Sequence, residues 1–327
     1  MRSKALIMQK QFIYSIVSVL AVAATSQGVF AEPVFVFDGS ENFVKFENKG
    51  IVLRADAGSS YGGLDGYRRV EIGTLGPDFL PAVGDIEIEI FTAQNTQNPE
   101  GTNLWFQSAT DHFSAYAALE ISKITVDVSG VVQVEYAPLS VADPFGILDP
   151  DLSKGEILAL YVNDGPEAVT DWDPNGSSLG AGVTSTTDGD LWATFGFSGI
   201  QGTDGYLYQR NDQFIGNPES GVGFGALNAI RQPLISTAVF PGVNDSTETL
   251  FGGAALLTDI HVQQKFERNT RFDPTLAAAD ATWSFWQFSS DDPLVFAAVP
   301  EPSSLFLFSA LFGGFLGFDR LRRKKTA

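Results

Sequence analysis

The stretch ITVDVSGVVQVEY, from Ile124 to Tyr136, decides the fold class of this chain. Apolar and polar residues alternate on both sides of Ser129-Gly130, and a period of two places successive side chains on opposite faces of a β-strand. Glycine accepts the positive φ that a tight hairpin turn requires. The stretch therefore predicts two antiparallel strands joined by a hairpin.

Similar short runs recur between residues 32 and 298. In DIEIEIFT, which begins at Asp85, one face is apolar and the other acidic. The other runs are FVKFEN, GIVLRADA, EILALYVND, LWATFGFSG, GYLYQRND, LLTDIHVQQKFE and ATWSFWQFSS. Turn signals such as NKG, GPD, NPEG and TTDGD separate them. No stretch of similar length has a helical period, so we predict an all-β fold, an antiparallel two-sheet β-sandwich of the jelly-roll type.

The strand runs fill one predicted domain, residues 32–298. No Pro-rich linker interrupts it, and the glycine-rich region Gly216–Gly225 is only a weak candidate for an internal boundary. Within it, Gly221–Ala226 imitates a dinucleotide-binding fingerprint, but the βαβ context that such a site needs is missing.

The N-terminus has the pattern of a secretory signal peptide, residues 1–31. Three basic residues precede the apolar run Phe12–Ala24, and small side chains stand at Val29 and Ala31. The alternative is an uncleaved membrane anchor, for which the apolar run is short of the roughly 20 residues that a span needs. We expect cleavage after Ala31.

The C-terminus, residues 299–327, combines Pro300, Glu301 and Pro302 with the apolar segment Ser304–Phe318 and a basic tail. As a helix the apolar segment would cover roughly 22 Å, less than the hydrocarbon thickness of about 30 Å. The basic residues are Arg320, Arg322, Arg323, Lys324 and Lys325. Positive charge favours the cytoplasmic side, so the preceding domain is expected outside the membrane. The alternative, a buried core helix, conflicts with these charges.

This order of motif, apolar helix and basic tail resembles the PEP-CTERM sorting signal of Gram-negative bacteria. The resemblance covers only the last 29 residues. It implies export across the inner membrane by the secretion machinery, transient anchoring by the C-terminal helix, and processing by an exosortase-type membrane enzyme. The implied destination is the cell surface or the extracellular medium, often in organisms that make extracellular polysaccharide.

Composition narrows the classes of function. The chain carries a formal charge of −19, and eight of its 20 basic residues lie in the two end segments, so the domain between them is still more acidic. Such a protein is repelled by nucleic acid, which we exclude as a partner. The absence of cysteine excludes disulfides, thiol nucleophiles and cysteine metal sites.

The best candidate for a metal site is DWDPNG, which opens like a calcium-binding loop. Asp171, Asp173 and Asn175 stand at alternate positions before a glycine, and the twelfth position is Gly182 instead of the usual glutamate. The remaining candidate ligands are Asp188 and Asp190. The alternative is an Asp-rich surface turn whose carboxylates bind their own backbone. Trp172 is the candidate glycan contact, because an exposed indole can stack on a sugar ring.

Two G-x-S-x-G sequences, centred on Ser60 and Ser178, resemble the nucleophile elbow of a serine hydrolase. That elbow needs a strand before the serine and a helix after it. We expect both serines in loops with no following helix. His112 and His261, the only histidines, are interpreted as structural.

No catalytic residue is therefore predicted, and the primary hypothesis is a non-enzymatic exported protein that associates with exopolysaccharide, with calcium as a possible cofactor. The first alternative is a secreted polysaccharide hydrolase or lyase on a jelly-roll scaffold. Two carboxyls about 5 to 9.5 Å apart across a cleft would favour it. The second alternative is a purely structural surface protein.

Overall fold

A computed structural model gives the fold. It describes residues 41–70, 81–98, 100–106, 111–126, 132–164, 178–197, 208–211, 220–231, 243–250, 254–258, 260–268, 286–290 and 293–297. Nearly all of this part is β-strand, and every strand pair is antiparallel. The predicted all-β, antiparallel class is confirmed.

The elements follow the chain in this order: β1 (Glu41–Tyr61), β2 (Leu64–Arg69), β3 (Ile86–Gln97), β4 (Asn103–Phe106), β5 (Asp111–Val126), β6 (Val132–Ala137), the 3₁₀ helix η1 (Leu152–Lys154), β7 (Glu156–Asp164), α2 (Leu179–Thr187), β8 (Asp190–Phe197), β9 (Tyr208–Asn211), β10 (Ser220–Arg231), β11 (Val243–Leu250), β12 (Ala254–Thr258), β13 (Ile260–Arg268), β14 (Phe288–Ser290) and β15 (Pro293–Ala297).

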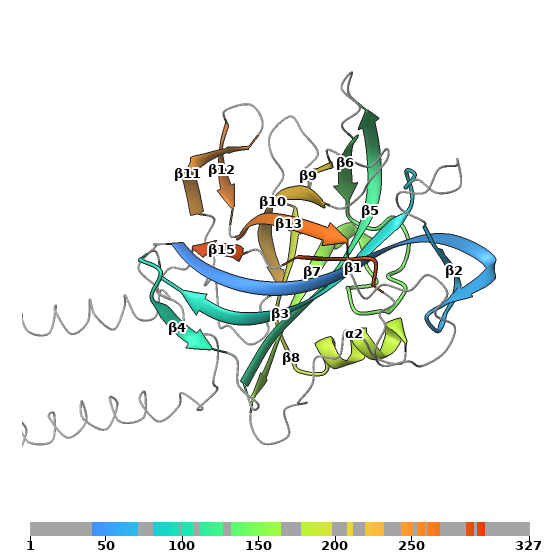
Figure 1. Cartoon of the computed structure of the whole chain (residues 1–327), viewed down its shortest axis with the longest axis horizontal. Helices are drawn as coiled ribbons and strands as arrows, with labels where there is room; N and C mark the ends of the chain where they lie inside the picture. The colour runs from blue at the N-terminus through green and yellow to red at the C-terminus, as the bar shows by residue number, and fades with distance from the viewer. Residues whose placement is uncertain are drawn as a thin grey trace, which may run out of the picture.

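The main sheet returns on itself. Pairing runs from β1 through β3, β5, β7, β8, β10, β13 and β15, and β15 pairs with β1 again. A second bridge between β5 and β10 is made by β6 and β9, and β14 joins β13 to β1 beside β15. Figure 1 shows β1 and β3 running side by side across the molecule. A closed ring of strands has an inner face and an outer face.

The inner face holds the larger hydrophobic cluster. It contains residues from β1, β3, β5, β6, β7, β8, β10 and β13, so it lies inside the ring. Aromatic side chains fill one part of it: Phe46 packs edge-on against Phe91 at 5.9 Å, and Phe113 against Trp192 at 5.2 Å between ring centroids. Such contacts add to the stability that area burial provides.

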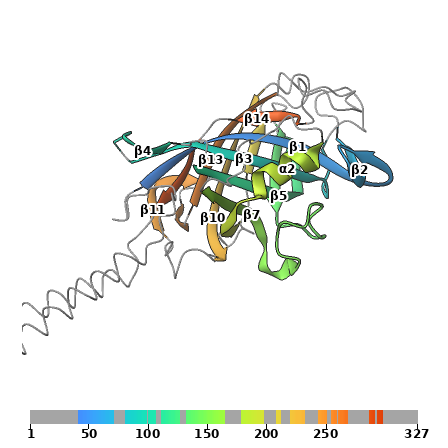
Figure 2. The same ribbon diagram turned by 90° about the horizontal axis from the view of Figure 1, so that it is seen from below.

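A second cluster covers the outer face of β3 and β5. Helix α2 lies across these two strands (Figure 2) and contributes Leu179 and Val183. Trp286 and the segment between β6 and β7 complete the cover. Both faces of β3 are consequently buried.

Helix α2 was not predicted, because its sequence, LGAGVTSTT, has no amphipathic pattern. Tertiary contact explains it. The Leu179 N–H donates to the Gly62 carbonyl at 3.1 Å, and Gly62 has a φ of 60°. A Cβ at Gly62 would lie 2.6 Å from the Leu179 side chain. Glycine at this position allows both the left-handed turn and the close approach of the helix.

One further expectation was wrong. The NKG signal lies inside β1, which continues unbroken for 21 residues because it is paired on both edges, to β3 and to β14 and β15. In the glycine-rich region, Gly221–Gly225 belong to β10 and pair with β13. The hairpin of β5 and β6 is confirmed, with Val126 opposite Val132, and residues 127–131 are outside the described part. His261 lies on β13, in an alternating strand as expected.

The signal peptide, residues 1–31, and the C-terminal segment, residues 299–327, lie outside the described residues and stay predictions. Within the part that the structure describes, no helix has the length and apolar character needed to cross a membrane.

Candidate functional site

A pair of acidic side chains lies inside the closed sheet. Along β3, Ile86, Ile88 and Ile90 point to the outer cluster, so Glu87 and Glu89 point to the inner face. Only 2% of each glutamate is exposed. The acidic face predicted for DIEIEIFT is therefore real, but it faces the core.

The strands on either side supply small and apolar neighbours. Glu87 lies opposite Val52 on β1 and Leu119 on β5, and Glu89 lies opposite Gly50 and Ala117. Directly paired residues of an antiparallel sheet share one face, which confirms that the acid pair is inside the ring.

Two polar side chains from other strands bind the pair. The Tyr136 hydroxyl, on β6, donates a hydrogen bond to Glu87 Oε2. The Asn48 Nδ2, on β1, donates to Glu89 Oε2 at 3.2 Å. Both donors are 2% exposed, so the four side chains form a polar cluster within an apolar core.

Burial raises the pKa of Glu87 well above its ordinary value. The negative charge of Glu89 and a hydrogen bond between the two carboxyls raise this pKa further, while the Tyr136 hydroxyl acts in the opposite direction. A hydrogen bond between two carboxyl groups requires a proton on one of them. Burial also raises the pKa of Tyr136 well above its ordinary value, so its hydroxyl stays a donor. These shifts favour the neutral forms of Glu87 and Tyr136.

This arrangement limits what the pair can do chemically. Glycoside hydrolysis needs carboxyls about 5 to 9.5 Å apart, with the sugar between them. Glu87 and Glu89 lie side by side on one face of the same strand and are almost fully buried, which leaves no place for a sugar ring between them. The geometry fits two acids that belong to the core.

Sequence reasoning did not single out this pair. The alternation in DIEIEIFT was visible, but it does not say whether the acidic face meets solvent or core. The only sequence signal was the large number of acidic residues, which offers many possible pairs.

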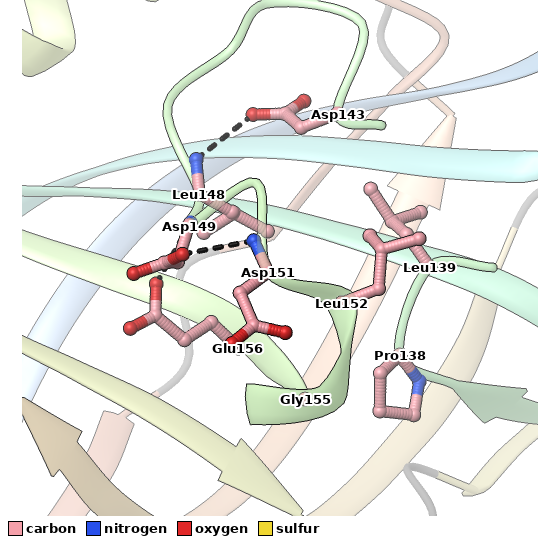
Figure 3. A pocket seen from close by; sticks show the side chains of 9 residues that line it. All are labelled: Pro138, Leu139, Asp143, Leu148, Asp149, Asp151, Leu152, Gly155 and Glu156. Carbon is pink, nitrogen blue, oxygen red and sulfur yellow. Dashed lines mark hydrogen bonds between the residues drawn. The ribbon is translucent and has the colours of Figure 1, made fainter. Parts of the chain in front are cut away.

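A second acidic cluster borders a small hollow on the outer side, in the segment between β6 and β7 (Figure 3). The hollow measures about 10 Å³, room for about one water molecule. The Asp143 carboxylate accepts hydrogen bonds from the backbone N–H groups of Ile147 at 2.7 Å and Leu148 at 3.1 Å, and from the Tyr116 hydroxyl. Asp143 thus holds this segment against the outer cluster.

The other carboxylates at the hollow also bind the protein itself. Asp149 Oδ1 accepts from the Asp151 N–H at 2.9 Å, and Asp149 Oδ2 is bound by Lys154 (Figure 3 shows the first contact). Glu156 Oε2 accepts from Arg231 Nη2 at 2.6 Å, and its Oε1 accepts from Thr194 Oγ1 at 2.8 Å. These bonds tie β7, β8 and β10 together and account for the clustering of acids.

The predicted calcium and glycan residues are mostly untested. Asp171, Trp172, Asp173 and Asn175 lie outside the described residues. Asp188 is the exposed C-cap of α2, and Asp190 is the exposed first residue of β8. Among the residues that are described, no group of three or more acidic or histidine side chains is placed to hold a metal.

The two elbow-like serines were misplaced by the sequence reasoning. Ser60 lies in β1, not in a loop. Ser178 is followed by a helix after all: it is the N-cap of α2, and its Oγ accepts from the Ala181 N–H at 3.1 Å. The hydroxyl oxygen therefore has the role of a helix cap.

The chain matches no protein-family model, no curated protein and no solved structure.

Proposed function

We propose that this chain is an exported, non-enzymatic β protein that works at the cell surface or in an extracellular polysaccharide matrix. The observation that supports a non-enzymatic role is that the buried acidic side chains are bound by other groups of the protein. Glu87 and Glu89 are bound by Tyr136 and Asn48 inside the core, and Glu156 binds Arg231 across strands. Carboxylates bound in this way stabilise the fold and do not form a sugar-cleaving site.

The route follows from the two chain ends. The signal peptide directs the N-terminus out, and the order of Pro300, Glu301 and Pro302, apolar segment and basic tail matches a sorting signal read by an exosortase-type enzyme. The predicted C-terminal helix would anchor the domain until processing.

We further propose that the sandwich takes the form of a flattened closed sheet. In this arrangement β1, β3 and β5 form one layer and β8, β10 and β13 the other. The shared inner cluster, with residues from both sets of strands, supports it. The layers would then be joined at both sides by strand pairing and not only by a core.

The route is tested in a Gram-negative host that has an exosortase. We expect the full chain to reach the outer surface, to be accessible to added protease, and to lose mass near Pro300. Replacing Pro300, Glu301 and Pro302 by alanine should leave the chain unprocessed in the membrane fraction. A variant with the five basic residues neutralised is the matched control for the tail. A chain that stays in the cytoplasm, or that loses the same mass with the motif replaced, would contradict the proposal.

Glycan association is tested separately, with purified protein on extracellular polysaccharide. Trp172→Ala is expected to weaken binding at least tenfold, an effect of roughly 1.4 kcal/mol. Phe106→Ala is the matched control, because Phe106 is an aromatic residue with 59% of its surface exposed. Equal loss in both variants, or no binding by the unaltered protein, would favour the purely structural alternative.

The hydrolase or lyase alternative predicts new chain ends when polysaccharide is incubated with the protein. We expect none. If new chain ends appeared with the wild type and were absent with Glu87→Gln, the acid pair would have to be reassigned as catalytic.

The calcium site at Asp171, Asp173 and Asn175 is tested by the melting temperature of the protein. A melting temperature that does not change at saturating calcium would rule out this site, since a ligand that binds only the folded state must stabilise it.

A further inference from the structure

Beyond the proposed function, we propose that Glu87 and Glu89 share one proton inside the closed sheet, so that the folded chain loses stability as the pH rises and this proton is lost. We call these two side chains the acid pair. The inference rests on their placement, because they lie side by side on the inner face of β3 and are almost fully buried. Tyr136, which binds Glu87, lies on β6, and β5 lies between β6 and β3.

Tyr136 adds a side-chain contact across β5. Backbone pairing joins β3 to β5 and β5 to β6, and the bond from Tyr136 to Glu87 spans all three strands on the inner face. Between them on β5 lie Leu119 and Ile121, both in the inner cluster. No solvent reaches the contact, since the hydroxyl donor and both acids are each only 2% exposed.

The described groups that pair with Glu87 or bind it are acidic, neutral or apolar. From β3 it faces Glu89, from β6 the neutral Tyr136, from β5 the apolar Leu119, and from β1 the apolar Val52. Asn48 is the polar neighbour of Glu89 from β1. Next along β3, Asp85 is neutralised by its own partner, Arg54, at 2.6 Å. Two ionised carboxylates side by side in this setting would repel each other in a poorly solvated space.

The sign of the pH effect follows from the raised pKa. Above about pH 4.5, Glu87 in the unfolded chain loses its proton while the folded chain keeps it. The folded state then binds more protons than the unfolded state, so stability falls as the pH rises. The fall ends once the pH passes the pKa of the folded state, where the acid pair is ionised.

Glutamine at position 87 imitates the protonated acid. Its amide oxygen can accept from Tyr136 and its amide nitrogen can donate to Glu89, which preserves both contacts without a titrating proton. The test compares urea unfolding of the wild type and Glu87→Gln from pH 4 to pH 9. The ratio of their unfolding constants is expected to grow by up to about tenfold per pH unit above the ordinary glutamate range. A ratio that does not change with pH would overturn the proposal.

A second measurement does not depend on the fold of that variant. Infrared difference spectra of the wild-type protein should show a protonated carboxylic acid that persists well above the ordinary titration range of glutamate. Tyr136→Phe removes the donor that stabilises the ionised form, so the band should survive to still higher pH. A spectrum without a persistent acid band, or a band lost at lower pH in Tyr136→Phe, would show that no proton is shared.

Discussion

Arg54 and Asp85 give the sharpest stability prediction, because they form a partly buried bidentate ion pair at the start of β3. Arg54 Nε and Nη2 each donate to one Asp85 oxygen at 2.6 Å, and the Ala82 N–H donates a third bond at 2.6 Å. The Asp85 side chain is 3% exposed and that of Arg54 is 22% exposed. Arg54→Met would leave a buried carboxylate with only a backbone donor.

The expected loss is about 3 kcal/mol in the free energy of unfolding. Breaking a fully buried pair costs about 3–5 kcal/mol, and the partial exposure of Arg54 places this one at the lower end. The assay is urea denaturation, followed by tryptophan fluorescence, of the chain without its two end segments. Arg54→Lys keeps the charge but cannot donate two parallel bonds, so we expect an intermediate loss.

A double-mutant cycle separates the pair from general damage to the core. Asp85→Leu removes the carboxylate that binds Arg54, whereas Arg54→Met with Asp85→Leu removes both charges and should cost much less than the sum of the single variants. Additive losses would refute the reasoning. So would a loss below about 1 kcal/mol for Arg54→Met, which is what an exposed ion pair gives.

The remaining predictions concern three other contacts. Burial alone would raise the pKa of Glu156, but its hydrogen bonds, first of all from Arg231, outweigh burial and lower this pKa below 4.5. The contribution of ionised Glu156 to the stability of the fold is therefore complete above about pH 4.5 and is lost as the pH falls. Glu156→Gln should therefore be less stable at neutral pH and equal to wild type in acid; an equal deficit at every pH would contradict this. The Gln287 side chain accepts a hydrogen bond from the Val52 N–H at 2.8 Å and donates one to the Val70 carbonyl. Gln287→Ala should therefore lower the free energy of unfolding by about 1–3 kcal/mol and speed hydrogen exchange at the Val52 amide. Unchanged exchange at Val52 would show that Gln287 does not hold these two segments together. Ser178→Ala should cost about 1 kcal/mol through loss of the α2 cap, while Ser178→Asp should keep most of the stability; equal stability of Ser178→Ala and wild type would exclude the capping role.

Local pattern was a good guide wherever a strand lay between clear turns. The pairing of β5 with β6 and the strand that became β7 followed directly from alternation. The NPEG signal also gave a turn, in which Gly101 has a φ of 78° and Asn98 accepts from the Thr102 N–H at 2.7 Å. Each of these features depends on residues a few positions apart.

Pattern failed where a distant segment decides the local structure. NKG has the composition of a turn, but pairing to β3 on one edge and β14 on the other keeps it extended. LGAGVTSTT has no helical pattern, but the cap at Ser178 and the contact of Leu179 with Gly62 hold it as a helix. Their partners are distant in the sequence, and no local period records them.

The sequence by itself determined the strands and their antiparallel sense, because alternation and turn residues act over short distances, and it predicts an export route from its two ends. Only the tertiary structure decided that the sheet closes on itself through β1 and β15, segments at opposite ends of the domain. Closure fixes which side of each strand becomes interior. For β3 it turned an acidic face, which alternation alone would allow to meet water, into a pair of buried glutamates.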